Sequence, residues 1–570
     1  MKVRLLCLVF LLTLWGISPA QSKMSESGKP GQAPAVQQPT RFLHLPEIVP
    51  DIHPADRATG KPAPWMNRPS RQENTSPPEY SRPARRAGSA MPAWQHLARL
   101  TPEERQNALI QMEASTDVAP EARAKLAEIE GLWNGGAFDQ AVEQLRAFQT
   151  SQPEIDVAVG ISWKTPRPVD LPAGSPTEGA DVRIGTRENV QQVALDFDAG
   201  TGNLFVALLY FDPATNSDYW TVNISTDGGA TWAETYLWAS SYDMNDIDAT
   251  VVGGYFYVAY IGLITQQEAR IRRFMVADGS VDNTYGFHVI FSAAAAITDV
   301  ALTANADFFN NRLYHLSILA NGTLEYYWTS DAGDPWNHVG SSVTNAAGGL
   351  DAHTNEGFTT NYLVVSYRST DNRVHVGLRS DPGSWTDVDL DAVDPLEEHT
   401  SIAAYQNRIM VVYKNSGGDL AYQVSYDEGA NWYSGVIAQN ILGWSPHLAG
   451  RHGGGFRVIY QEEAGTFDPL WTRHRDYGTG PGTAPWDGPT QFNEIDVFTG
   501  SPVNTEWIPP NVAPYDHGAV WIGGATFGAW FDRIEGTPPP PPNDDCANAI
   551  PVAVPSVTPG TTIGATVDSL

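Results

Sequence analysis

The pattern of apolar and polar positions changes its period once along this chain, near Pro153. Before that point, apolar residues recur at the spacing of an amphipathic helix. A helix start is expected at Thr101, because this capping residue is followed by Pro and by two acids that suit the positive end of a helix dipole. The pattern therefore predicts a small α-helical segment over residues 96–152. Its three helices are expected to carry Leu109, Ile110 and Met112, then Ala122, Leu126 and Ile129, and finally Ala141, Leu145 and Phe148.

After Pro153 the pattern becomes that of short β-strands separated by Gly, Asn and Asp turns. Strand-like runs at 204–210, 255–260 and 408–413 each follow a turn and a second short apolar run. The aspartates at positions 227, 278, 331, 381, 427 and 476 follow one another at intervals of 51, 53, 50, 46 and 49 residues. A repeat of this length is typical of a four-stranded propeller blade. The sequence thus predicts a mainly β protein, with a β-propeller over residues 155–536.

The repeated aspartates belong to a motif. Residues 225–232 read S-T-D-G-G-A-T-W and residues 425–432 read S-Y-D-E-G-A-N-W, with related versions at 329–336 and 380–385. The motif resembles the Asp box, or BNR repeat, of the sialidase-like β-propeller superfamily in its exported bacterial form. In that family the boxes lie away from the active site, so the resemblance implies that Asp closes a turn and Trp packs between sheets. The residues concerned are Asp227, Trp232, Asp331, Trp336, Asp381, Trp385, Asp427 and Trp432.

The number of blades follows from the innermost strands. Seven starts are predicted, near Val193, Ile247, Val300, Leu350, Ser401, His447 and His517. The seventh repeat is followed by Pro-rich sequence, so its outer strands must come from elsewhere. Residues 157–163 and 181–184 precede the first repeat and could supply them. Seven blades are therefore predicted, with six, the sialidase number, as the alternative.

An active site is harder to identify than the fold. The resemblance implies that a sialidase would need three arginines around the substrate carboxylate, a tyrosine nucleophile paired with a glutamate, and an aspartate acid/base. The R-I-P motif of the family has a partial counterpart at Arg183-Ile184-Gly185, which lacks the proline and also fits the last strand of the closing blade. No Tyr–Glu pair can be assigned from the sequence. The predicted function is therefore the binding of a glycan or a surface protein, and the alternative is a sialidase-like glycoside hydrolase.

Acidic and histidine residues lie close to the starts of the predicted inner strands. If these starts converge at the mouth of the central channel, the side chains could hydrogen-bond a sugar or bind a divalent cation. Calcium would be bound by Asp299, Asp351 and Asp516, whereas a softer metal such as zinc would recruit His353, His447 and His517. The alternative is that strand entries are polar because they adjoin turns. The candidate residues are Asp246, Asp248, Asp299, Asp351, His353, His399, His447, Asp516 and His517.

The two ends of the chain differ from the repeats, and the N-terminal end predicts export. Residues 1–20 have the basic start, apolar run and small residues of a signal peptide, which predicts a secreted or cell-surface protein. Residues 21–95 have the composition of a Pro-rich disordered linker. Residues 537–542 form a stiff Pro-rich spacer, and residues 543–570 resemble the start of a C-terminal β-sandwich module that is truncated here. Cys546, the one cysteine after the predicted signal peptide, fits a module whose second cysteine lies further on.

Charge narrows the range of partners. The formal net charge is −30 at pH 7, from 65 acidic and 35 basic residues. Such a surface repels nucleic acids and anionic membranes, so neither is an expected partner. No run after the signal peptide reaches the length of a transmembrane helix.

Overall fold

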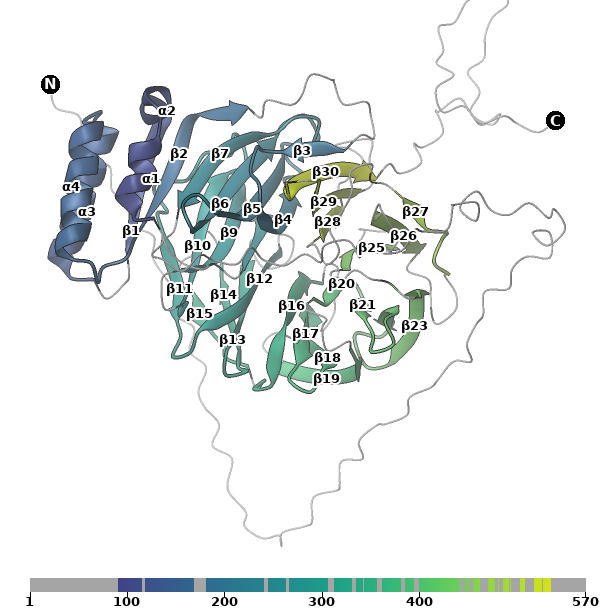
Figure 1. The fold of residues 1–570 in the computed structure, drawn as a ribbon. Coiled ribbons are helices and arrows are strands. Elements are labelled where there is room, and N and C mark those ends of the chain that lie inside the picture. Colours follow the sequence, from purple (N-terminus) through teal and green to yellow (C-terminus); the bar gives the residue numbers. More distant parts are fainter. Residues whose placement is uncertain are drawn as a thin grey trace, which may run out of the picture. The chain divides into compact units, whose positions relative to one another are not determined.

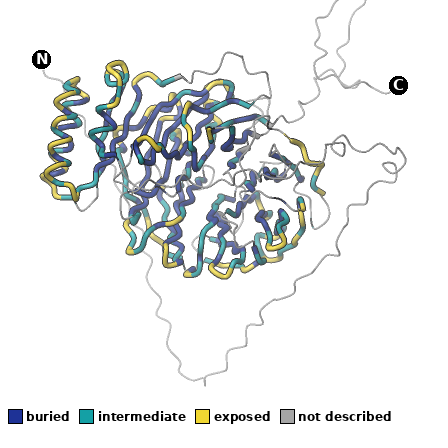
Figure 2. The backbone as a smooth tube through the Cα atoms, in the orientation of Figure 1, coloured by how far each residue is buried: buried dark blue, intermediate teal, exposed yellow. Residues whose placement is uncertain are grey.

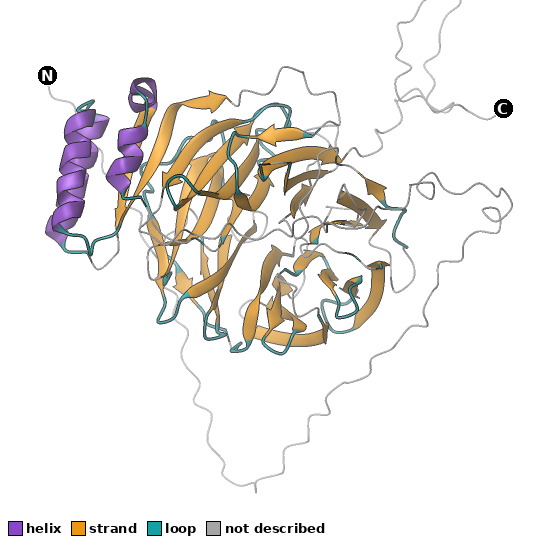
Figure 3. Cartoon of the chain, viewed as in Figure 1, coloured by secondary structure: helices purple, strands orange, loops and turns teal. Residues whose placement is uncertain are grey.

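The computed structural model describes residues 91–534 apart from a set of gaps. The predicted signal peptide, most of the predicted N-terminal linker and the predicted C-terminal spacer and module lie outside the described residues. Figure 3 shows that the described part is built mainly from strands, with a few helices near its start. None of its helices is long and apolar enough to cross a membrane. The gaps are residues 115–117, 169–180, 240–243, 245, 263–265, 306–311, 331–334, 342, 356–360, 381–384, 394–398, 440, 442–445, 451–454, 462–469, 477–479, 481–484, 492, 494–502, 508–516 and 525.

The strands form seven antiparallel sheets, which are the blades of a β-propeller (Figure 1). Each innermost strand contacts the innermost strand of the next sheet, and the last one contacts the first, so the ring is closed. The prediction of seven blades is therefore confirmed.

From the innermost strand outwards, blades 1 to 4 are built as follows. Blade 1 contains β4 (Val190–Phe197), β5 (Leu204–Asp212), β6 (Ser217–Ser225) and β7 (Ala233–Ala239). Blade 2 contains β8 (Ile247–Val252), β9 (Tyr255–Gly262), β10 (Glu268–Met275) and β11 (His288–Ser292). Blade 3 contains β12 (Ile297–Asn305), β13 (Arg312–Leu319), β14 (Leu324–Thr329) and β15 (Asn337–His338). Blade 4 contains β16 (Ala346–Thr354), β17 (Asn361–Ser369), β18 (Arg373–Ser380) and β19 (Trp385–Ala392).

Blades 5 to 7 follow the same plan. Blade 5 contains β20 (Ser401–Tyr405), β21 (Arg408–Lys414), β22 (Leu420–Ser425) and β23 (Trp432–Ala438). Blade 6 contains β24 (His447–Gly450), β25 (Gly455–Gln461), β26 (Leu470–Asp476) and β27 (Thr490–Gln491). Blade 7 contains β28 (Val503–Trp507), β29 (His517–Gly523), β30 (Gly528–Ile534) and, as its outermost strand, β3 (Val182–Ile184).

The ring is closed by a strand from before the first repeat. β3 pairs with β30, with Val182 opposite Phe531 and Ile184 opposite Ala529. The predicted closing role of residues 181–184 is thus confirmed, and Arg183 lies on the outermost strand of blade 7. The prediction that His517 begins an innermost strand is wrong, because β29 is the second strand and β28 lines the channel. The apolar pattern missed β28 because this strand is short and mostly polar.

Residues 157–163 do not join blade 7 as predicted. They belong to β2 (Val157–Pro168), which pairs with the outer strand β7 of blade 1. β1 (Ala108–Ala114) pairs in turn with β2, so blade 1 grows to six strands. The free edge of β7 accepts β2, and Val157, Val159 and Ile161 become buried in the same core as blade 1.

The N-terminal helices are α1 (Ala93–Arg99), α2 (Pro102–Asn107), α3 (Pro120–Asn134) and α4 (Phe138–Ser151). The predicted helix start at Thr101 is confirmed: the Thr101 side chain accepts a hydrogen bond from the Glu104 backbone N–H, and the Glu104 side chain reciprocates. The prediction that Leu109, Ile110 and Met112 lie on a helix is wrong, since they belong to β1. Pairing with β2 outweighs the local preference at these positions.

Helix α3 covers the edge of β1. The Ile110 N–H donates to Asn134 Oδ1 at 2.9 Å, and Asn134 Nδ2 donates back to the Ile110 carbonyl at 3.0 Å. The Met112 N–H donates to Glu130 Oε2 at 3.0 Å. These side chains replace a neighbouring strand, and an edge that could otherwise pair with another chain is protected.

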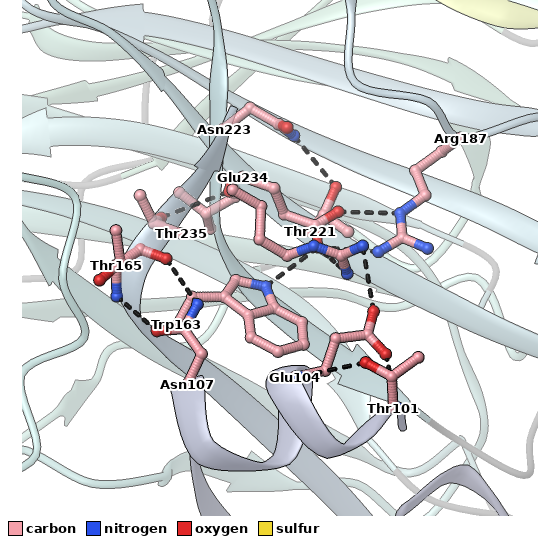
Figure 4. Close-up of polar contacts among 12 residues, drawn as sticks. Thr101, Glu104, Asn107, Trp163, Thr165, Arg187, Thr221, Asn223, Glu234 and Thr235 are labelled. Carbon is pink, nitrogen blue, oxygen red and sulfur yellow. Dashed lines mark hydrogen bonds and ion pairs between the residues drawn. The ribbon is translucent and has the colours of Figure 1, made fainter. Parts of the chain in front are cut away.

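A polar network around Glu234 ties the helices to the ring (Figure 4). Glu234, on β7, accepts hydrogen bonds from Arg187 at 2.7 and 2.8 Å and from Trp163 Nε1 at 3.0 Å. Arg167, on β2, forms an ion pair with Glu104 of α2 at 3.2 Å. Since Arg187 follows β3 in the chain, the network joins the closing strand, blade 1 and the helical segment.

The hydrophobic core is divided among the interfaces between neighbouring blades, and Figure 2 shows the strands buried along most of their length. One cluster combines Phe205 and Trp220 of blade 1 with Phe256 and Val258 of blade 2. Equivalent clusters fill the following interfaces. Each blade therefore depends on its neighbours for burial of its faces.

The turn between β6 and β7 shows the local role of the motif aspartate. Asp227 accepts hydrogen bonds from the Ser225 hydroxyl at 2.8 Å and from the Thr231 N–H at 2.9 Å. Gly229 has φ 95°, and a side chain there would collide with the Phe531 ring of blade 7. The Asp427 turn has the same bonds, with Asn431 in place of Thr231. Asp331 and Asp381 lie outside the described residues.

Two motif tryptophans differ in burial, which provides a matched pair of mutations. Trp232 is 2% exposed and packs on Phe531 with ring centroids 5.3 Å apart, whereas Trp432 is only partly buried. Trp232→Ala is expected to lower the free energy of unfolding by about 3–5 kcal/mol, because it opens a cavity between blades 1 and 7. Trp432→Ala is expected to cost clearly less in the same urea titration. Equal losses would contradict the inter-blade role of Trp232.

Candidate functional site

The seven innermost strands enclose a cavity of about 350 Å³. Every blade contributes to its lining, from Asp196 on β4 round to Asn504 on β28. The volume lies at the lower end of the range found for small-molecule sites in proteins. This central cavity is the candidate functional site.

Hydrogen-bonding side chains in the cavity come from inner strands of several blades. They include the carboxyl groups of Asp196, Asp248 and Asp351 and the imidazoles of His353 and His447. No Arg or Lys is present among the described residues that line the cavity. The described lining therefore offers many hydrogen-bonding groups but no Arg or Lys cation.

Most of these groups are engaged in hydrogen bonds between blades. A side chain on one innermost strand accepts a hydrogen bond from a backbone N–H of the next innermost strand, 47 to 58 residues further along the chain. Across the described residues these bonds cross six of the seven interfaces. The acceptor and donor residues are Asp196 and Val251, Asp246 and Val300, Asp248 and Leu302, Asp299 and Leu350, Asp351 and Ile402, His353 and Ala404, Ser401 and Leu448, and His447 and Thr505.

These inter-blade hydrogen bonds have a simple physical cause. The innermost strand of each blade has one edge without a partner strand, and its N–H groups there need acceptors. A short acidic, serine or histidine side chain on the preceding blade reaches this edge, so the polar inner-strand residues stabilise the ring. Since six of the seven interfaces repeat the geometry among the described residues, the acceptors recur at the period of the repeat.

Burial changes the protonation of these side chains. It raises the pKa of Asp248 and of Asp299 well above the usual range, and it raises the pKa of Asp196 to about 6. Burial also lowers the pKa of His447 to about 4, and the neighbouring histidines His399 and His353 add to this effect. Burial thus disfavours the charged forms of these groups, although Asp196, with a pKa of about 6, still loses its proton below neutral pH.

The predicted candidate residues are only partly brought together. Asp248, Asp351, His353 and His447 line the cavity. Asp246 and Asp299 are not among the described lining residues, although they also accept inter-blade hydrogen bonds. His399 forms an isolated bridge with Gly349. Asp516 and the side chain of His517 lie outside the described residues.

Sequence reasoning missed several lining residues, among them Asp196 and Asn504. Asp196 lies 52 positions before Asp248, which in turn lies 103 positions before Asp351, so the repeat period could have revealed it. Asn504 could not be found in this way, because it lies on the unpredicted strand β28. Its Oδ1 is buried and has no hydrogen-bond donor among the described residues.

The predicted metal site stays a prediction, because Asp516 and the side chain of His517 lie outside the described residues. No group of three His, Cys, Asp or Glu side chains in the described ranges is placed to hold a metal ion. Of the predicted calcium ligands, Asp299 and Asp351 accept hydrogen bonds from backbone N–H groups of different strands, and Asp516 is not described. These two carboxyl groups are thus engaged in hydrogen bonds within the ring, which compete with the binding of a cation.

Asp351 provides a direct test of the inter-blade hydrogen bonds. Its Oδ2 accepts from the Ile402 N–H at 2.8 Å and the Ser401 hydroxyl at 2.7 Å, and its Oδ1 accepts from the Ala352 N–H at 2.8 Å. Asp351→Asn turns one acceptor into a donor that faces a backbone N–H, so we expect a loss of about 1–3 kcal/mol in urea unfolding. The control is Asp389→Asn, because Asp389 is half exposed on β19. Unchanged stability of Asp351→Asn would show that these bonds contribute little.

Comparison with known proteins gives structural likenesses at low sequence identity. No protein-family model matches the chain, and no curated protein sequence matches it. A similar solved structure is the BP39L lectin from Burkholderia pseudomallei, at 14% identity and TM-score 0.44, covering 61% of this chain and 100% of the lectin. The NanB sialidase from Streptococcus pneumoniae is similar at 11% identity and TM-score 0.37, over 67% of this chain and 74% of the enzyme. A fucose-specific lectin from Aleuria aurantia follows at 14% identity and TM-score 0.34, over 51% and 96%.

Proposed function

We propose that this protein is an exported propeller that binds a neutral glycan in its central cavity. The observation that carries the proposal is the lining: it is rich in hydrogen-bonding groups and, among its described residues, contains no Arg or Lys. A sugar hydroxyl both donates and accepts, so it matches a mixture of carboxyl, imidazole and amide groups. Export and a location outside the cell rest on the N-terminal sequence.

Two cavity groups have hydrogen-bonding capacity left for a ligand. Asn504 Oδ1 is a buried acceptor without a described donor. His447 Nδ1 accepts the Thr505 N–H at 3.2 Å, which leaves the proton of the neutral ring on Nε2 as a donor. An acceptor and a donor from neighbouring strands of the ring suit the hydroxyl groups of one sugar.

Neither alternative fits the cavity as well. A sialidase-like hydrolase would need arginines to neutralise the carboxylate of its substrate, and the described lining has none. A protein partner would need a surface of about 800 Å² on each side, which this cavity cannot present. A glycan is therefore the partner that the cavity favours.

The proposal is tested by screening the protein against an array of neutral and sialylated glycans. We expect binding to neutral sugars, and Asn504→Ala should weaken it at least tenfold, about 1.4 kcal/mol, without changing the melting temperature. The control is Asn337→Ala, on the exposed strand β15. The proposal fails if no neutral glycan binds, or if Asn504→Ala binds as well as the unmodified protein.

A further inference from the structure

β23 forms an open and uncharged sheet edge on the outer side of blade 5. Its residues Trp432–Ala438 read W-Y-S-G-V-I-A, with no charged residue and no proline. One edge of β23 pairs with β22, and no strand in the described part of the chain pairs with the other edge. Val436 is 47% exposed, more than any other large apolar side chain that the structure describes. An edge of this kind pairs readily with a further strand.

The regular part of this edge is Trp432–Val436. A bulge follows at Ile437, where the register between β22 and β23 shifts, and the Ile437 carbonyl accepts a hydrogen bond from Arg473 of blade 6. Before the bulge, the outer edge has no hydrogen-bond partner among the described residues. A stretch of this length is typical of a strand in a globular protein, so it is long enough to pair.

The other outer edges of the propeller are protected. In blade 1 the edge of β7 is covered by β2 and β1, and α3 in turn caps β1. β3, β15 and β27 contain only two or three residues, and the short strand β11 has a bulge against β10. β19 is eight residues long but carries Asp387, Asp389 and Asp391. Short strands, bulges and charges prevent unwanted pairing of sheet edges, so β23 is the exception among the described outer strands.

Blade 1 shows that an outer edge of this propeller can be extended. β2 pairs with β7, with Val159 opposite Ala239 and Ile161 opposite Leu237, and β1 then adds a sixth strand. The innermost strand of the same blade, β4, still closes the ring against β28. A further strand on β23 therefore requires no change in the ring.

A second copy of the chain is the partner that fits this edge. Antiparallel pairing about a two-fold axis places a strand against itself, so each copy supplies the same donors and acceptors to the other. The formal net charge of −30 makes most approaches of two copies repulsive, but β23 has no charge of its own to oppose pairing. We propose that β23 pairs with β23 of a second copy, so that one sheet continues from blade 5 of one copy into blade 5 of the other.

The pairing of β23 is independent of the proposed glycan site, which lies on the innermost strands. A dimer would nevertheless carry two central cavities, and two linked sites bind a surface of repeated glycans more tightly than one site does. That consequence rests on the proposed function, whereas the dimer itself does not.

Sedimentation velocity of the full chain tests the proposal. We expect a reversible equilibrium that shifts toward the dimer with protein concentration and with NaCl, because salt screens the repulsion between acidic copies. Val436→Lys places like charges against each other on the paired edges, so the dimer dissociation constant should rise roughly tenfold or more. Val339→Lys is the matched control, since Val339 is 36% exposed beside β15 of blade 3 and the variant adds the same charge. Both side chains are exposed, so both variants should keep the melting temperature of the unmodified protein.

Hydrogen exchange of Trp432–Val436, measured by mass spectrometry at low and high protein concentration, identifies the paired edge. Protection should increase with concentration in the unmodified protein but not in Val436→Lys. The proposal is overturned if the chain stays monomeric throughout, or if Val436→Lys and Val339→Lys dimerise equally well, since another surface would then form the dimer. Protection that does not depend on concentration would also overturn it, because a segment of the same chain would then cover β23.

Discussion

Deletion of residues 155–187 is expected to leave no folded propeller. The deletion removes β3, so β30 loses its partner and blade 7 is left with an open edge. It also removes β2 with its buried side chains Val157, Val159 and Ile161. Each buried aliphatic side chain contributes about 1.5–3 kcal/mol, and a whole domain is stable by only about 5–15 kcal/mol. Circular dichroism and urea titration of the shortened chain would measure the effect.

A single substitution on β3 separates the effect of weaker ring closure from the effect of removing residues 155–187 altogether. Ile184 is 0% exposed on β3, so Ile184→Ala is expected to cost about 2–5 kcal/mol. Its neighbour Arg183 is only partly buried, and Arg183→Ala should change stability little. If the deleted chain melts like the intact protein, the ring does not depend on β3 for closure.

Glu113→Gln is expected to be the most damaging single substitution that preserves shape, with a loss of about 3–5 kcal/mol. The side chain is 1% exposed and pairs with Arg270, which is 2% exposed. Gln lacks the charge and offers one acceptor oxygen for the three donors that Glu113 satisfies, namely Arg270, Trp238 and Tyr260. Arg270 would then keep only its ion pair with Glu268 as charge compensation among the described residues.

Two further variants check this interpretation by urea unfolding. Glu128→Gln breaks the exposed pair with Lys125 on α3 and should change stability by less than about 1 kcal/mol. The double variant Glu113→Gln, Arg270→Met should recover part of the loss, because the buried charge is then absent. If Glu113→Gln is as stable as the unmodified protein, the buried network is not what holds β1 against blade 2.

The inner-strand aspartates show how far a sequence pattern can lead and where it stops. Their position at the period of the blades was visible in the sequence, and the structure places Asp248 and Asp351 in the central cavity. Their bonding was not visible, because an acidic residue beside a turn fits a ligand site as well as an acceptor for a backbone N–H. The distinction depends on the neighbouring blade, whose Leu302 and Ile402 N–H groups lie within hydrogen-bond distance of these carboxyl groups.

The sequence by itself determined the class of fold, because strand alternation, turn residues and a period of about fifty residues are local properties that repeat along the chain. It also determined that a segment before the first repeat closes the ring, since the last repeat lacks outer strands of its own. Only the tertiary structure decided that Ile110 lies in a strand, that residues 157–163 extend blade 1, and that β28 lines the channel. In each case the outcome depends on a partner distant in sequence: β2 for β1, β7 for β2, and the edge of the inner ring for β28. Contacts of this kind outweigh local preference because a strand is stabilised by the edge and the core that it meets, and neither is encoded in its own residues.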